Sequence, residues 1–217
     1  MTITLEPNSL SLNDVHRLLK LQKQPNGLFT DYLNLEPLTD FEQQDLSRIR
    51  NDFERYLTAG KISEGMVKFF TIAPLMRLAG FYDIPIRLTM EDVIGIVIED
   101  EDKVIKGRMD ILAVNQAESD IEAPFWVLVI ETKNSAIDVS EGLAQLLTYA
   151  FKGLEQQLLV WGLVTNGQRY QFVYLNQGNP PNYQLMPLLS LNELQGSVLL
   201  LQVMKAICGL NSFSKQF

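Results

Sequence analysis

The sequence predicts an α/β fold in which a mixed five-stranded sheet lies between helices, preceded by a helical extension. Segments with apolar residues at helical spacing alternate with short runs rich in valine and isoleucine, in the order helix, three strands, helix, two strands, helix. Two links between successive strands have the composition of hairpin turns, which join antiparallel strands. The helix after the third strand predicts a right-handed crossover between parallel strands. One sheet is therefore expected to contain both kinds of strand pair.

The helical extension is predicted to comprise residues 1–60, packed on a core domain of residues 61–217. Within it, residues 9–23 carry apolar side chains close to helical spacing and are followed by a Pro-Asn-Gly stop. A second pattern begins at residue 39 or 40, mixes apolar positions with charges of both signs, and ends near Gly60. We expect this second helix to be amphipathic, with one face in solvent.

The third helical pattern, residues 62–79, is apolar on nearly all sides, which predicts a buried helix. Pro74 is expected to kink or split it, because proline cannot donate the helical hydrogen bond. Glu64 is the polar exception. It follows Ser63, so its carboxylate can favour the positive end of the helix, or it can point into a site; this segment alone favours the first interpretation.

Strands are predicted next, at residues 85–90 with 93–98 and at residues 103–114, because these runs are rich in β-branched and apolar side chains. The acidic residues 99–102 between them have the character of a solvated hairpin tip. The second of these strands carries one carboxylate, Asp110, inside an apolar run. A buried acid is costly unless it has a partner, so Asp110 is a candidate site residue.

A polar loop, residues 115–124, leads into six consecutive apolar residues, Phe125–Ile130, which suit a strand covered on both faces. Glu131, Thr132 and Lys133 end this run. The two-residue period of a strand puts Glu131 and Lys133 on one face. An acid and an amine there are costly to desolvate unless they use each other, a metal or a ligand.

The helix expected over residues 139–154 begins after Asp138, which with Glu141 fits a capping box. Glu141, Gln145 and Tyr149 are four residues apart and share one face of this helix.

Two further strands are predicted at residues 157–165 and 170–175, joined by Asn166-Gly167, a strong hairpin signal. Residues 191–210 are expected to form the closing helix.

Composition and net charge limit the classes of protein to which the chain can belong. The single cysteine, Cys208, allows no disulfide within the chain, which suits a reducing compartment. The first residues lack the pattern of a leader, and no apolar run reaches the length of about 18 residues that spans a bilayer. We therefore expect a cytoplasmic protein with no membrane contact.

The net charge of −8 argues against a chain that coats nucleic acid by bulk electrostatics.

Four short motifs lie in order on the predicted elements: Gly107-Arg108-Met109-Asp110, Val129-Ile130-Glu131-Thr132-Lys133, Glu141-Gly142-x-x-Gln145 and Val164-Thr165-Asn166-Gly167. Together they resemble the PD-(D/E)XK nuclease superfamily, and more narrowly the N-terminal nuclease region of type I restriction enzyme R subunits, over Lys61–Leu175. The resemblance implies a restriction-endonuclease-like fold and an endonuclease that hydrolyses phosphodiester bonds, with DNA as the substrate and Mg²⁺ or Mn²⁺ as the cofactor.

The resemblance also assigns roles to residues. It implies that Asp110, Glu131, Lys133 and Gln145 are catalytic. Metal ligands would be Asp110, Glu131 and the backbone carbonyl of Thr132, since Mg²⁺ and Mn²⁺ prefer oxygen. Glu64, a further ligand, and Tyr149 would have secondary roles.

The sequence departs from the family pattern in two respects. Met109 stands where the superfamily has its proline, and no helicase motor follows before Phe217. We therefore expect a free-standing nuclease or a restriction-related subunit recruited by others.

Each site residue also has an ordinary structural explanation. Glu131 and Lys133 can be a solvated ion pair at a strand end, and Asp110 can hydrogen-bond a turn. These explanations do not account for the placement of all the polar exceptions where one metal site needs them. The only histidine, His16, lies outside the motifs, which disfavours a zinc site and a Ser-His-Asp triad.

Acidity is the main objection to a nuclease, because half of the 26 acidic residues lie between Glu91 and Glu141. Two explanations follow: a partner subunit or a homodimer supplies affinity for DNA, or the chain is a nuclease-fold interaction module with weak or no activity. Basic residues near the site form a candidate local rim despite the global charge: Arg77, Arg87, Lys103, Lys106, Arg108 and Lys152.

Overall fold

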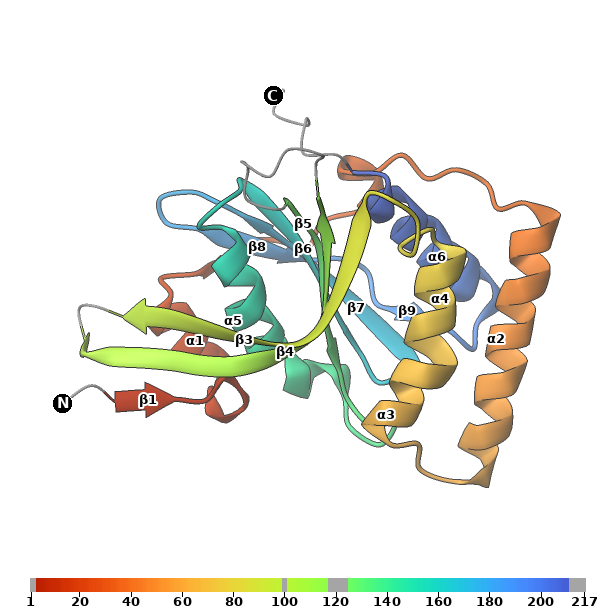
Figure 1. Cartoon of the computed structure of the whole chain (residues 1–217), viewed down its shortest axis with the longest axis horizontal. Coiled ribbons are helices and arrows are strands. Elements are labelled where there is room, and N and C mark those ends of the chain that lie inside the picture. Colours follow the sequence, from red (N-terminus) through yellow and green to blue (C-terminus); the bar gives the residue numbers. More distant parts are fainter. Residues whose placement is uncertain (1–2, 99–100, 117–124, 211–217) are drawn as a thin grey trace.

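The structure is a computed structural model that describes residues 3–98, 101–116 and 125–210. A mixed sheet with helices on both faces forms its centre (Figure 1). The helices α2 (Asp40–Ala59), α4 (Ala73–Leu78) and α6 (Leu194–Cys208) cover one face. The helices α1 (Leu12–Leu18) and α5 (Leu143–Gly153) cover the other. The predicted α/β class with a mixed sheet is confirmed.

Nine strands make up the sheet in the described residues, rather than the five that we predicted. The main strands are β3 (Ile86–Ile98), β4 (Lys103–Asn115), β5 (Phe125–Thr132), β6 (Leu159–Thr165) and β7 (Arg169–Asn176). The additional strands are β1 (Ile3–Leu5), β2 (Gln22–Lys23), β8 (Asn182–Leu185) and β9 (Leu189–Ser190). Each additional strand has two to four residues, too few for a two-residue period to be recognised.

The central strands follow the order β1-β4-β5-β6-β7-β8-β2, with β3 paired to β4 and β9 paired to β7. The pairs β4–β5 and β6–β7 are antiparallel, whereas β5 and β6 are parallel and joined through α5, as a crossover requires. The N-terminal segment is not purely helical, because β1 pairs with β4 and β2 pairs with β8. The extension therefore adds a strand at each end of this order.

Two helices of the N-terminal segment have the caps that their sequences favour. Ser11 caps α1 and Thr39 caps α2, and each forms a capping box with the acid three residues later. The helix α2 ends before Gly60, whose φ of 142° is rare for other residues. Its start and end agree with the prediction.

The predicted helix over residues 62–79 is split into α3 (Glu64–Val67), a π-helical turn at Lys68–Ile72, and α4. The split confirms the expected effect of Pro74, since the turn ends two residues before it, with the Ala73 N–H bonded to the Lys68 carbonyl. The expectation of burial on all sides is wrong for Phe69, which is 70% exposed, because one side of the helix faces solvent.

The strands β3 and β4 form a long hairpin that projects beyond the rest of the sheet (Figure 1). Glu91 interrupts β3 at a φ of 58°, between the pairs Met90–Ile111 and Asp92–Met109, so the strand continues past this irregularity. The predicted acidic tip lies partly outside the described residues, and so does most of the predicted loop at 115–124.

The helix expected from residue 139 begins as a 3₁₀ turn, Val139–Gly142, before α5. The predicted capping box is wrong, because the Asp138 side chain accepts from the Ser140 N–H rather than from Glu141. In this tighter turn the Glu141 N–H donates instead to the Asp138 backbone carbonyl. No helix in the described ranges is long and apolar enough to cross a membrane.

Candidate metal centre

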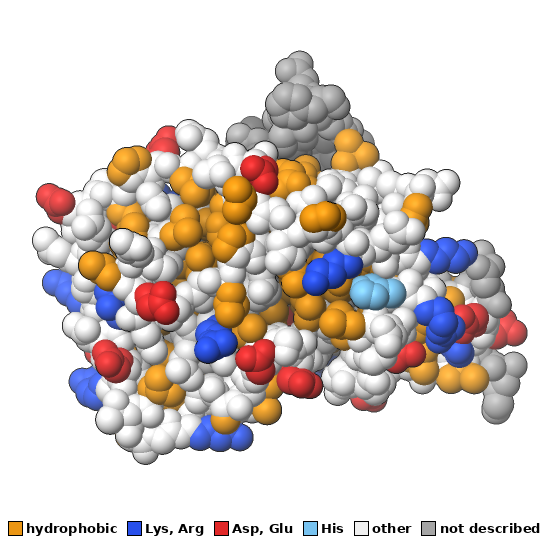
Figure 2. Space-filling view, turned by 180° about the vertical axis from the view of Figure 1, so that it is seen from behind, with side chains coloured by type: hydrophobic (Ala, Val, Ile, Leu, Met, Phe, Trp, Pro, Cys, Tyr) orange, Lys and Arg blue, Asp and Glu red, His pale blue; other side chains and the backbone are white. Residues whose placement is uncertain are grey.

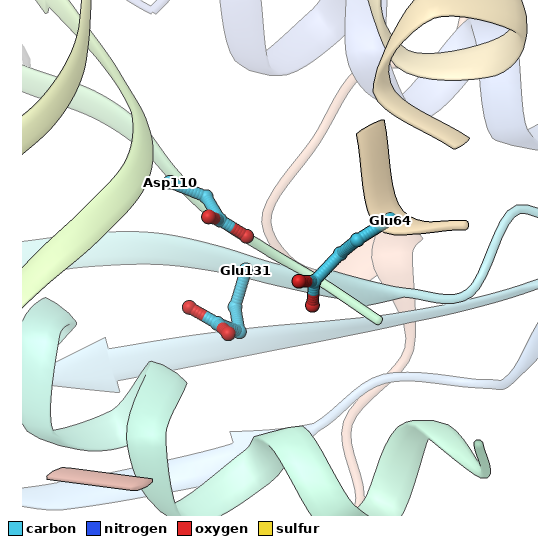
Figure 3. Close-up of side chains that lie close together, drawn as sticks. All are labelled: Glu64, Asp110 and Glu131. Atoms are coloured by element: carbon cyan, nitrogen blue, oxygen red, sulfur yellow. The ribbon is translucent and has the colours of Figure 1, made fainter. Parts of the chain in front are cut away.

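Three carboxylates from three elements converge at the end of β5 (Figure 3). Glu64 lies in the first turn of α3, Asp110 on β4 and Glu131 on β5. One oxygen of each lies within 4.8 Å of the others. The pairing of Ile111 with Ile130 places the next residues along, Asp110 and Glu131, side by side.

Asp110 is held from two sides. Its Oδ2 accepts hydrogen bonds from the Thr132 backbone N–H, at 2.7 Å, and from the Thr132 hydroxyl, at 2.5 Å. Its Oδ1 accepts from the Lys68 ammonium at 2.6 Å. These contacts fix the orientation of the carboxylate.

Glu131 is a buried acid that is only partly satisfied. Its side chain is 2% exposed, and Oε1 accepts from Lys133 Nζ at 2.8 Å. Oε2 has no hydrogen-bond partner within the described part of the chain. Burial, with the negative charges of Asp110 and Glu64, raises the pKa of Glu131 to about 8 against the opposing effect of Lys133. A buried oxygen without a partner is costly, and a cation offsets that cost.

Lys133 continues into a chain of hydrogen bonds on α5. Its Nζ donates to Gln145 Oε1, and Gln145 Nε2 donates to the Tyr149 hydroxyl, each at 3.0 Å. Burial raises the pKa of Tyr149 to about 12, so its hydroxyl stays protonated at neutral pH. These hydrogen bonds hold the Lys133 ammonium beside Glu131, and side chains on α5 fix its orientation.

Two glycines of the motifs allow these close approaches. A Cβ on Gly142 would lie 2.6 Å from Val164 Cγ2 and 3.1 Å from Lys133 Cε. A Cβ on Gly107 would lie 2.9 Å from the Tyr149 hydroxyl. A side chain at either position would push against the groups that carry the site, so the glycines have a steric role here.

The structure brings together all the residues that the sequence singled out for one site. For Glu64 the two interpretations are compatible, because Ser63 caps the helix through the Met66 N–H while the Glu64 carboxylate reaches the cluster. The Thr132 carbonyl stays a predicted ligand, and what the structure shows is that the Thr132 N–H and hydroxyl hold Asp110.

Sequence reasoning missed Lys68 and Glu91. Lys68 contacts Asp110 and lies 3.7 Å from Glu91 Oε1. Its signal was a single lysine inside an apolar pattern, four residues after Glu64 and so on the same helix face. Glu91 gave no such signal, because its position depends on how β3 bends opposite Asp110.

The donor set fits a hard divalent cation. All three side chains offer oxygen, which Mg²⁺ and Mn²⁺ prefer. The buried Glu131 Oε2 has no hydrogen-bond partner in the described residues, so it is free to coordinate a cation. Metal binding requires Glu131 to be ionised, so its raised pKa predicts that binding releases a proton below about pH 8.

The chain was compared with models of known protein families and with curated proteins, and neither comparison gave a match.

Proposed function

We propose that the protein is a metal-dependent nuclease of the PD-(D/E)XK type that hydrolyses phosphodiester bonds of DNA. The observation that carries the proposal is the buried, partnerless Glu131 Oε2 beside Asp110 and Glu64, with Lys133 on the other Glu131 oxygen. The order of the motifs resembles that superfamily and supports the same assignment.

Asp110, Glu131 and Glu64 would hold Mg²⁺ or Mn²⁺, with the Thr132 carbonyl as a further ligand. When bound, such an ion lowers the pKa of an attacking water and offsets charge that grows on the phosphoryl oxygens. Glu131 and Asp110 lie on adjacent strands, so their relative positions are fixed by the sheet.

Lys133 would orient the attacking water and stabilise charge on the phosphoryl oxygens. Its ammonium is a compact cation with three donors, of which Glu131 and Gln145 occupy two. One donor thus remains for a water or a phosphoryl oxygen. Gln145 positions Lys133, and Tyr149 positions Gln145.

Two basic residues offer a local approach for a polyanion. Lys106 and Arg108 are exposed on β4, four and two residues before Asp110 respectively, and neither has an ion-pair partner in the described ranges. They lie on the open side of the hairpin, since their paired residues on β3, Gly95 and Val93, are exposed as well. On the face turned away from the view of Figure 1, acids and bases of the described residues are interspersed (Figure 2). The stretch of β4 that carries Lys106 and Arg108 is our candidate for a nucleic-acid interface.

Replacing Lys106 by serine should weaken DNA binding and flatten its dependence on salt, because each phosphate contact releases counterions. Lys23→Ser, an exposed lysine on β2 at the far end of the strand order, is the matched control and should leave both unchanged. Fluorescence anisotropy with a labelled duplex at several salt concentrations, in Ca²⁺, measures the effect. Equal losses in the two variants would mean that Lys106 contributes only general charge.

The function is tested by incubating the purified protein with linear, circular and single-stranded DNA in Mg²⁺ or Mn²⁺, and by titrating Mn²⁺ calorimetrically. We expect cleavage and Mn²⁺ binding, both lost in Asp110→Asn. Binding without cleavage would favour a regulatory metal site, and absence of both would favour the interaction module described above.

A further inference from the structure

Lys68 contacts carboxylates on two neighbouring strands. Its Nζ lies 2.6 Å from Asp110 Oδ1 and 3.7 Å from Glu91 Oε1. Its side chain is 18% exposed, so it is held mainly by protein groups rather than by water. The contact with Asp110 is a short, charge-assisted hydrogen bond, and the contact with Glu91 is an ion pair at longer range.

The oxygens of the cluster are not equally available to a cation. Glu131 offers Oε2 with no rearrangement, because this atom has no partner within the described residues. Asp110 Oδ2 already accepts two hydrogen bonds from Thr132, so Oδ1 is the oxygen left to offer. Lys68 holds that oxygen. Lys68 and a divalent ion therefore compete for the same atom.

We propose that Lys68 is a displaceable counter-ion, which pairs with Asp110 until a divalent ion binds and then moves to Glu91. The inference rests on the proposed function, because it presupposes an ion at the three carboxylates. The acceptor for the displaced ammonium is already present: Glu91 is half-exposed, sits at the irregular point of β3 opposite Asp110, and needs only a shorter contact to form a full ion pair.

The lysine keeps its charge in this setting. Its ammonium lies against two carboxylates, Asp110 and Glu91, and these favour the charged form. A protonated Lys68 lowers the affinity for the ion in two ways, by occupying Asp110 and by like-charge repulsion. It therefore sets the ion concentration at which the site fills.

Calorimetric titration of Mn²⁺ into the native protein, Lys68→Met, Glu91→Gln and the double variant tests the inference. Loss of a hydrogen bond to a charged group corresponds to about tenfold or more in an equilibrium constant, so Lys68→Met should lower the Mn²⁺ Kd about tenfold. Glu91→Gln should raise the Kd severalfold, because Lys68 loses its second partner. In the Lys68→Met background the same Glu91 substitution should have a much smaller effect.

Two controls accompany the cycle. Lys205→Met removes another partly buried lysine that contacts a carboxylate, Glu42, away from the site, and it should leave the Mn²⁺ Kd unchanged. Lys68→Gln retains a donor for Asp110 without the charge, and replaces Lys68→Met if thermal melts in EDTA show that the methionine variant does not fold.

The outcomes separate the inference from the proposed function. Unchanged or weaker Mn²⁺ binding by the folded Lys68 variants, with clear binding by the native protein, would overturn the displaceable counter-ion and leave the metal site standing. No Mn²⁺ binding by the native protein or by any Lys68 variant would overturn both. Mn²⁺ binding by Lys68→Met, with none by the native protein, would support the inference most strongly.

Discussion

Lys133→Met should reduce DNA cleavage by about 10²–10³-fold or more, the usual loss when a preorganised charge at the reacting group is removed. The change removes the ammonium that contacts Glu131 and Gln145 and leaves an apolar stem of similar length. Cleavage of supercoiled plasmid in Mg²⁺, followed as a rate under single-turnover conditions, measures the effect.

Metal binding and folding distinguish this outcome from a general loss of structure. The variant keeps all three carboxylates, so it should still bind Mn²⁺, and its thermal transition should remain cooperative. Lys205→Met is the matched control: Lys205 lies on α6 and pairs with Glu42 away from the site, so cleavage should be unaffected. Full cleavage by a folded Lys133→Met protein would refute the assignment of Lys133.

Glu131→Gln should stabilise the protein in EDTA while abolishing Mn²⁺ binding. Folding raises the pKa of Glu131 from 4.5 to about 8, mainly through burial. Between these values the unfolded chain has released the proton that the folded chain retains, so the native protein loses stability as pH rises from about 4.5 to about 8. Glutamine does not titrate, and its amide can donate to the neighbouring carboxylates.

The stability difference between Glu131→Gln and the native protein should therefore grow between pH 5 and 8 and then level off, reaching on the order of a few kcal/mol. Urea unfolding in EDTA at several pH values measures it, with Glu54→Gln on the exposed side of α2 as the control. Added Mn²⁺ should stabilise the native protein and not the variant. A difference that does not depend on pH would show that Glu131 is not held protonated by burial.

The parts of the site that could be predicted are those that break a local pattern. Asp110 interrupts an apolar strand, Glu131 and Lys133 end one, and Gln145 and Tyr149 share a helix face. Each departure is visible within a few residues of sequence. The structure then places the members on β4, β5 and α5, at distances that permit the contacts described.

The parts that could not be predicted depend on contacts between distant segments. The role of Lys68 depends on where α3 and the π-helical turn sit against β4, which is 42 residues away along the chain. The short strands β1 and β2 owe their pairing to β4 and β8 rather than to their own sequences. The turn after Asp138 closes on Ser140 instead of Glu141, a choice between two neighbouring N–H groups that composition does not decide.

The contact at Gly107 has a practical consequence. A Cβ there would also meet Pro7 Cγ at 2.7 Å, so the segment that follows β1 lies directly against the strand that carries Asp110 and beside the Tyr149 hydroxyl. Residues 3–10 thus pack against the strand that carries Asp110. Preparations intended for cleavage assays should therefore keep residues 3–10 intact.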